Sequence, residues 1–150
     1  MTAATTALCF DYGTRRTGVA VGQRLTGTAR PLTTIGMPQG SPDWDAIDAL
    51  LREWRPAQLV VGRPTRMDGT PVPMTEAAEC FARDLGERYR LPVALVDERL
   101  SSRAAETLLR EQRAEGRRGR IDKAEIDRYA AALLLEDWLA QPASTDTSHT

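Results

Sequence analysis

Carboxylates are the side chains in this sequence best able to do chemistry, because histidine and cysteine are few and poorly placed. The single histidine, His149, lies near the end of a tail of Ala, Ser, Thr and Asp, where nothing would hold it rigidly. Cys9 and Cys80 lack metal-ligand spacing and are expected to be reduced core residues. Nucleophile–histidine mechanisms and His- or Cys-based zinc sites are therefore disfavoured. Clustered Asp and Glu oxygens would instead suit a hard ion, Mg²⁺ or Mn²⁺.

Asp11 is the first candidate ligand. It ends an apolar run and stands beside Gly13, which lets the backbone turn sharply or lets a ligand approach. An acid after such a run is costly unless it is paired. The alternative is a turn residue that accepts hydrogen bonds from the Gly13–Thr14 backbone.

Asp97 and Glu98 directly follow another apolar run, at the carboxyl end of an expected strand, where sites in α/β folds usually form. Neighbouring residues on an extended segment point opposite ways, so we expect only one of the two to be a direct ligand. The alternative is that they stabilise the dipole of the following helix, or that Arg99 pairs with either. Asp127 lies in the first turns of the last expected helix, at the edge of its apolar face, where it could equally be a dipole-complementing acid.

The elements that must position these acids alternate along the chain. Period-two and continuous apolar runs predict five strands, the first two of them joined as a hairpin. Helical spacing predicts four helices, the first capped by Ser41 or Asp43, and the later strand–helix alternation predicts a parallel section of sheet. The expected strands are 7–12, 17–22, 27–35, 58–62 and 93–96, and the expected helices are 47–54, 78–89, 101–112 and one from Lys123 with the stripe Ile126, Tyr129, Ala130, Leu133, Leu134 and Trp138.

Size and composition predict one domain over residues 1–141 and a disordered tail over 142–150. A chain of 150 residues with 41% hydrophobic residues can build one core. No apolar run approaches the length of a membrane span, and the start lacks a secretion signal pattern, so we expect a cytoplasmic protein with no membrane partner. The net charge of −1 argues neither for nor against a polyanionic partner.

Several stretches together resemble the YqgF, or RuvX-like, family. Four motifs occur in the same order as in that family and span almost everything from Leu8 to Leu139, which is far more specific than DYGT alone. The sequence departs from the family pattern at Gly22 and Gln23, where a serine and an acid are expected, and at Ser101 and Ser102, which replace threonines. The motifs are CFDYGTRRTGVAVG from Cys9, VVGRPTRMDGT from Val60, DERLSSRAAE from Asp97 and DRYAAALLLEDWL from Asp127.

The resemblance implies a ribonuclease H-like α/β fold, with a mixed five-stranded sheet flanked by helices, its first three strands antiparallel and the remainder parallel. It also implies a nuclease that resolves Holliday junctions or matures the 5′ end of 16S ribosomal RNA. The acidic residues of the family carry over onto Asp11, Glu98 and Asp127, and neither departure touches them.

The mechanism that we expect is hydrolysis by water at two ions roughly 4 Å apart, held by these three carboxylates. The partner would be RNA or DNA, and resolvase activity would favour a homodimer, because two strands are cut in related positions. Arginines would position the phosphate backbone without reading sequence, although each one singly could be an ordinary surface residue. The candidates are Arg15, Arg16, Arg63, Arg66, Arg99, Arg117, Arg118 and Arg120, the last three in an expected mobile basic loop, 114–120.

Two other functions are compatible with parts of this pattern. The phosphate-binding turn of actin-like and sugar kinases also resembles DYGT, but those folds need two such domains, and this length offers one. A nucleic-acid-binding factor in ribosome assembly or transcription could keep the fold without chemistry. The intact acids argue against that second possibility.

Overall fold

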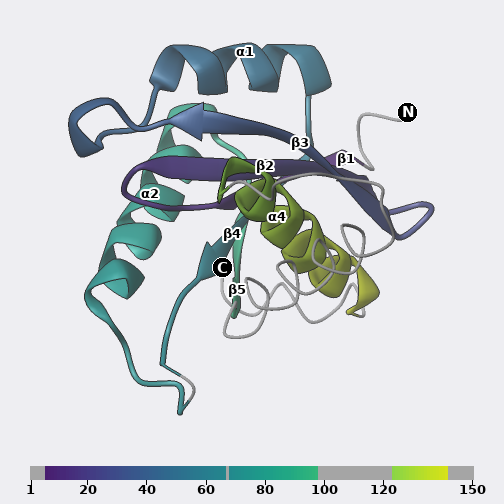
Figure 1. The fold of residues 1–150 in the computed structure, drawn as a ribbon. Helices are drawn as coiled ribbons and strands as arrows, with labels where there is room; N and C mark the ends of the chain where they lie inside the picture. The colour runs from purple at the N-terminus through teal and green to yellow at the C-terminus, as the bar shows by residue number, and fades with distance from the viewer. Residues whose placement is uncertain (1–5, 67, 98–122, 142–150) are drawn as a thin grey trace, which may run out of the picture.

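A computed structural model of the chain describes residues 6–66, 68–97 and 123–141 (Figure 1). The strands are β1 (Thr6–Asp11), β2 (Arg16–Gln23), β3 (Thr28–Gly36), β4 (Gln58–Arg63) and β5 (Val93–Asp97). The helices are the short 3-10 turn η2 (Pro38–Gly40), α1 (Trp44–Trp54), α2 (Pro73–Tyr89) and α4 (Lys123–Ala140). The expected helix 101–112, the basic loop 114–120 and the tail 142–150 lie outside the described residues.

The strands form one five-stranded mixed sheet in the order β3-β2-β1-β4-β5. β1 and β2 pair antiparallel, as do β2 and β3, whereas β4 pairs parallel with both β1 and β5. The expected fold class, with three antiparallel strands followed by parallel ones, is therefore confirmed. The parallel pairs need crossovers, and α1 and α2 supply them.

Local signals explain where the two crossover helices begin. The Asp43 side chain accepts a hydrogen bond from the Ala46 N–H, so Asp43, one of the two expected caps, is the N-cap of α1. α2 begins at Pro73, five residues before the expected start at Ala78. Proline at the first helical position lacks only an N–H that would be unpaired there anyway, so Pro73 can open the helix ahead of its apolar stripe.

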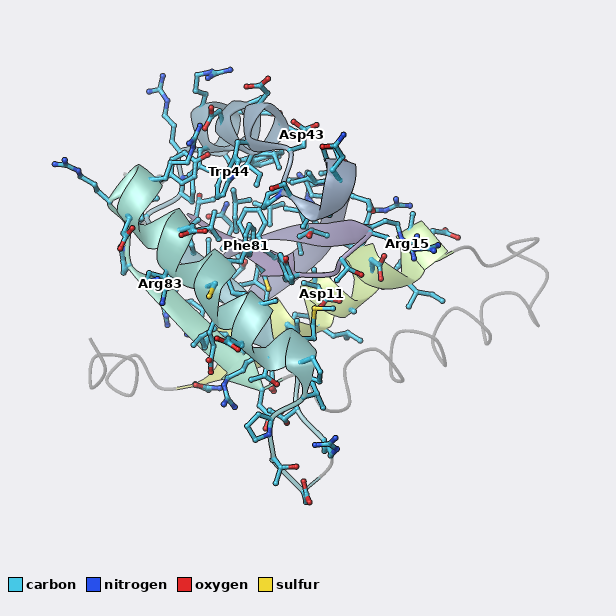
Figure 2. All side chains as sticks on the ribbon, turned by 90° about the vertical axis from the view of Figure 1, so that its left-hand side faces the viewer. Asp11, Arg15, Asp43, Trp44, Phe81 and Arg83 are labelled. Atoms are coloured by element: carbon cyan, nitrogen blue, oxygen red, sulfur yellow. The ribbon has the colours of Figure 1, made fainter. Side chains whose placement is uncertain are left out.

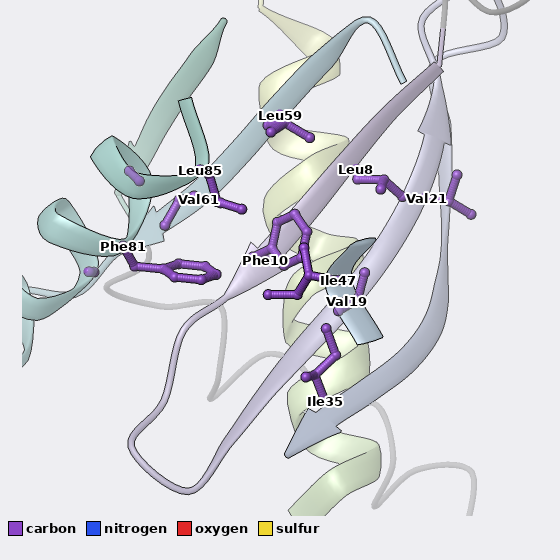
Figure 3. Packing of buried hydrophobic residues seen from close by; sticks show 12 residues of the cluster. Leu8, Phe10, Val19, Val21, Ile35, Ile47, Leu59, Val61, Phe81 and Leu85 are labelled. Carbon is purple, nitrogen blue, oxygen red and sulfur yellow. The ribbon is translucent and has the colours of Figure 1, made fainter. Parts of the chain in front are cut away.

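The sheet separates two hydrophobic cores. On one face, Leu8 and Phe10 of β1 pack with Ile47 of α1 and with Phe81 and Leu85 of α2. Figure 3 shows these side chains on the face of the strands turned away from α4. On the other face, the alternate residues of β1, Ala7 and Cys9, pack against α4.

α4 lies across the second face of the sheet and is buried along more of its surface than the expected stripe. Ile126, Tyr129 and Leu133 of the expected stripe are only half-buried. The stripe was thus partly wrong, because the helix packs over several strands and buries positions around much of its circumference. The buried residues of α4 are Ala130, Ala131, Ala132, Leu134, Leu135, Trp138 and Leu139.

Both cysteines are free thiols, as expected, but only one is a core residue. Cys9 is fully buried between β1 and α4, whereas Cys80 is half-buried on α2, with its sulfur 3.2 Å from a guanidinium nitrogen of Arg83. The core placement expected for Cys80 is wrong, since its position on α2 falls at the margin of the apolar face. Among the described helices, none is both long enough and apolar enough to cross a bilayer.

Candidate functional site

One edge of the sheet gathers most of the described candidate residues. The parallel strands β1, β4 and β5 end there, at Asp11, Arg63 and Asp97. β2 runs antiparallel to β1 and therefore begins at the same edge, with Arg16. The alternation of strands and crossovers thus brings together residues that are far apart in sequence.

Asp11 lies on the α4 face of the sheet. Side chains alternate along a strand, and Ala7 and Cys9, four and two residues earlier, both pack against α4. In the antiparallel register Asp11 is paired with Gly18 of β2. Directly paired residues share a face, so the position where Gly18 lacks a side chain faces α4, immediately beside Asp11. Asp11 can be found at the end of β1 in Figure 2.

Asp127 lies directly over Gly18. A Cβ built on Gly18 would overlap the backbone carbonyl of Asp127 and would lie 2.9 Å from the backbone nitrogen of Arg128. The peptide following Asp127 therefore occupies the space that a side chain at position 18 would fill. The structure thus brings Asp11 and Asp127, 116 positions apart in the chain, to either side of one glycine.

Arg16 holds the Asp127 side chain. Its Nε donates a hydrogen bond to Asp127 Oδ2 at 2.8 Å, and the two side chains are 32% and 28% exposed. The contact joins the first residue of β2 to the second turn of α4. It leaves the other guanidinium N–H groups as potential donors to phosphate.

A threonine on β3 fixes the first turns of α4 from the other side of Gly18. Thr34 is paired with Gly18 across β2 and β3. Its hydroxyl donates to the backbone carbonyl of Ala124 at 3.1 Å and accepts a hydrogen bond from Arg128 at 3.3 Å. Asp11, Gly18 and Thr34 therefore form one row across three strands, and α4 begins over that row.

The turn between β1 and β2 is organised by a buried hydroxyl. Thr17 is 1% exposed; it donates to Met37 Sδ at 3.2 Å and accepts from the Gly13 N–H at 3.4 Å. A Cβ on Gly13 would overlap the carbonyl of Arg16, so the turn is too tight for any other residue without rearrangement. These contacts set the backbone between Asp11 and Arg16.

The structure distinguishes Asp97 from Glu98 as candidate ligands. Val96 is buried in the core beneath α4, so by strand alternation Asp97 points to the opposite face from Asp11. Glu98 lies outside the described residues. Within residues 6–66, 68–97 and 123–141 no three Asp, Glu, His or Cys side chains are grouped closely enough to hold a metal ion.

The predicted phosphate contacts differ in their surroundings. Arg15 is exposed on the turn after β1 (Figure 2), whereas Arg16 is paired with Asp127. Arg63 Nε donates to Glu79 of α2 at 2.7 Å, and Arg66 donates to the carbonyl of Pro71 at 2.9 Å within its own loop. The candidates outside the described residues are Arg99, Arg117, Arg118 and Arg120.

Sequence reasoning missed Gly18, Thr17 and Thr34, which carry no reactive group but build the row and the turn beside it. A signal existed for Gly18 alone, because a glycine inside a strand pattern often marks a close backbone approach. For Thr17 and Thr34, alternation shows only that they belong to strands. The partners of their hydroxyls are set by tertiary packing.

Comparison with protein families and with known proteins agrees with this architecture. The family model RuvX, described as "Holliday junction resolvase", matches residues 5–141. A protein of Pseudomonas paraeruginosa is 50% identical over 134 residues, covering 89% of this chain and 91% of its own. One of Xanthomonas oryzae pv. oryzae is 48% identical over 137 residues, covering 91% and 88%. Both carry the name "Putative pre-16S rRNA nuclease".

Two solved structures share the fold at low sequence identity. RuvC of T. thermophilus in complex with a Holliday junction substrate is 15% identical, with a TM-score of 0.57, covering 95% of this chain and 98% of its own. The yeast mitochondrial Holliday junction resolvase Ydc2 is 12% identical, with a TM-score of 0.50, covering 91% and 78%. At these identities the likeness shows a RuvC-like, ribonuclease H-like fold.

Proposed function

The chain belongs to the RuvX family, and on this premise we propose that it is a divalent-metal-dependent nuclease that hydrolyses phosphodiester bonds in nucleic acid. One observation carries the proposal: the backbone of Asp127 lies against Gly18, the strand partner of Asp11, at the edge of the sheet where the parallel strands end. Like charges gain nothing from such proximity unless a cation lies with them. Arg16 supplies one such cation to Asp127 in the structure.

The donor set fits Mg²⁺ or Mn²⁺. Asp11 and Asp127 offer hard carboxylate oxygens, and Mg²⁺ in nucleases and polymerases is commonly held by one or two carboxylates together with substrate phosphate and water. Asp11, Asp127 and Glu98 would hold the ions. A bound ion of this kind activates water and stabilises the leaving oxygen of a phosphodiester.

The remaining residues of the chain would place the substrate. Arg15, exposed near Asp11 on the β1–β2 turn, would contact phosphate directly. Arg16 is paired with Asp127, and its remaining guanidinium N–H groups would donate to phosphate. Arg63 is held by Glu79 of α2, on the face of the sheet opposite Asp11, and Arg66 bonds within its own loop, so these two would contact the nucleic acid only at a distance from the cut.

The substrate that we propose is the 5′ end of precursor 16S ribosomal RNA. Support comes from relatives about half identical over nearly the whole chain that bear this activity in their names. Branched DNA is the second candidate, favoured by the description of the family model. The non-catalytic alternative, a nucleic-acid-binding factor, predicts binding to RNA without cleavage.

The test is cleavage of a labelled panel: precursor 16S RNA with its 5′ extension, single-stranded DNA and a four-way junction, each with Mg²⁺, Mn²⁺ or EDTA. We expect cutting that needs the metal and falls by about a hundredfold or more in Asp11→Asn and Glu98→Gln, since each replaces an anionic ligand of the proposed ions with a neutral amide and so weakens the ions' stabilisation of the reacting phosphate. Asp97→Asn is the matched control and should retain activity, because Asp97 faces the other side of the sheet.

Equal cutting by wild type and Asp11→Asn would indicate a contaminating nuclease and would contradict the assignment. Binding of precursor RNA with no metal-dependent cleavage would favour the non-catalytic alternative. Cutting of the junction alone would move the substrate from ribosomal RNA to branched DNA.

A further inference from the structure

We propose that Gly18 is a positioning residue of the metal site: the absence of a side chain there sets how closely the Asp127 end of α4 can approach Asp11. This inference rests on the proposed function, because it concerns the same carboxylates. Gly18 has no functional group, yet the proposal gives it a specific effect on metal affinity.

At position 18 the backbone of β2 packs directly against the backbone of α4. Gly18 is paired with Asp11, and the atoms that a Cβ would strike are the carbonyl oxygen and carbon of Asp127 and the nitrogen of Arg128. Backbone in a helix cannot swing aside as a side chain can. Even one methyl group must therefore move the first turns of α4 away from β1 and carry the Asp127 carboxylate with them.

The same strand offers a matched comparison at Gly22. Gly22 also faces α4, but a Cβ there would approach side-chain methyl groups of α4, at 2.9 Å for Leu135 and 3.1 Å for Leu139, and the carbonyl of Thr28 at 2.9 Å. A methyl group at Gly22 thus crowds the same helix against the same strand, but about two turns or more beyond Asp127. Gly22→Ala should lower stability without moving Asp127 relative to Asp11.

Thr34 constrains the helix by an independent contact. Its hydroxyl bonds to Ala124 and Arg128 hold the helix turns on either side of Asp127 against the sheet. Thr34→Val removes these bonds without adding bulk. It should move Asp127 in the same direction as Gly18→Ala does, but by less. Thr34→Ser keeps the hydroxyl and should leave Asp127 in its wild-type position.

The experiment is titration of Mn²⁺ into wild type, Gly18→Ala, Gly22→Ala, Thr34→Val and Thr34→Ser, followed by calorimetry and by electron paramagnetic resonance of free Mn²⁺. Thermal unfolding in EDTA measures the stability of each variant, and RNA binding in EDTA shows whether its nucleic-acid-binding surface is intact. We expect Gly18→Ala to bind Mn²⁺ about tenfold or more weakly, as residues that orient metal ligands typically do when changed. Gly22→Ala should keep wild-type Mn²⁺ affinity at a lowered melting temperature, and all variants should bind RNA alike.

Equal Mn²⁺ affinity in Gly18→Ala and wild type would overturn the inference. So would an equal loss in Gly18→Ala and Gly22→Ala, since the effect would then follow stability and not position. If Gly18→Ala does not fold, the threonine pair decides: weaker binding in Thr34→Val, restored in Thr34→Ser, supports the inference, and no difference contradicts it. Failure of wild type to bind Mn²⁺ at all would instead count against the proposed function.

Discussion

Arg16 Nε donates to Asp127 Oδ2 at 2.8 Å, so a predicted phosphate contact and a predicted metal ligand are partners in the structure. Both side chains are about one-third exposed, and water screens the pair. An ion pair of this kind adds about 0–1 kcal/mol to stability. Its larger consequence is local, because the guanidinium occupies one side of a carboxylate that the proposed function assigns to metal binding.

Replacing Arg16 by alanine should therefore change binding more than stability. Loss of the competing positive charge should tighten Mn²⁺ binding by about fivefold, equivalent to ~1 kcal/mol. The same change should weaken binding of a phosphodiester strand, because a phosphate donor is lost. Calorimetric Mn²⁺ titration and RNA binding at several salt concentrations measure the two effects.

Arg16→Lys keeps the charge but not the planar fork, so it should leave Mn²⁺ affinity near that of wild type. Weaker Mn²⁺ binding by Arg16→Ala would mean that Arg16 orients Asp127 and does not compete for it.

Thr17→Val should loosen the turn that carries Arg15. The change is nearly isosteric and leaves the Gly13 N–H without its acceptor and Met37 Sδ without its donor. We expect a loss of about 1–2 kcal/mol in the free energy of unfolding, measured by urea denaturation. Thr17→Ser keeps the hydroxyl and should recover part of that loss. A Thr17→Val protein as stable as wild type would show that these hydrogen bonds contribute nothing net.

Asp48 should give the protein a stability component that disappears in acid. Arg88 of α2 donates to both carboxylate oxygens and Tyr89 donates to one, and these hydrogen bonds lower the pKa of Asp48 below its ordinary value of 3.8. A carboxyl whose pKa is lower in the folded than in the unfolded state stabilises the fold above the unfolded pKa. That stabilisation is lost as the pH falls through the folded pKa.

Asp48→Asn should accordingly lower the urea midpoint near neutral pH, and the difference from wild type should shrink as the pH falls below 3.8 and disappear once Asp48 is protonated in the folded protein. A difference that is constant over this range would assign the effect to packing between α1 and α2 rather than to charge. Asp45→Asn, on an exposed position of the same helix, is the control.

Phe81→Ala should produce the largest stability loss. Phe81 is 3% exposed and its ring lies 5.7 Å from that of Phe10, 5.0 Å from Tyr12 and 6.0 Å from Trp44. Figure 3 shows Phe81 beside Phe10. Deleting a buried ring costs about 3–5 kcal/mol through lost burial and the cavity left behind. Urea unfolding measures the loss, and Phe81→Leu should lose less. A cost below about 1 kcal/mol would indicate that the core collapses around the site.

The sequence by itself determined the elements and their order. Alternating and continuous apolar runs locate all five strands of the described sheet to within one residue at each end. For α1 the apolar spacing predicts the end at Trp54, but the helix begins at Trp44, three residues before the expected start, directly after Asp43, one of the two expected caps. The exclusion of histidine and cysteine chemistry needed only the number and placement of those residues. The place of Asp11 after an apolar run made it a candidate ligand, whereas Asp127 was chosen on the family resemblance, since its place alone fitted a dipole-complementing acid equally well.

Only the tertiary structure decided what lies between those acids. Three contacts join the sheet to α4 across 90 or more positions of sequence: Gly18 lies against the backbone of Asp127, Arg16 pairs with the side chain of Asp127, and Thr34 bonds to Ala124. The local sequence pattern does not predict such contacts, because periodicity determines which face of an element a residue lies on and not which residue it contacts there. The same reason explains the misplaced stripe of α4 and the exposure of Cys80: how much of a helix is buried depends on the surface it packs against.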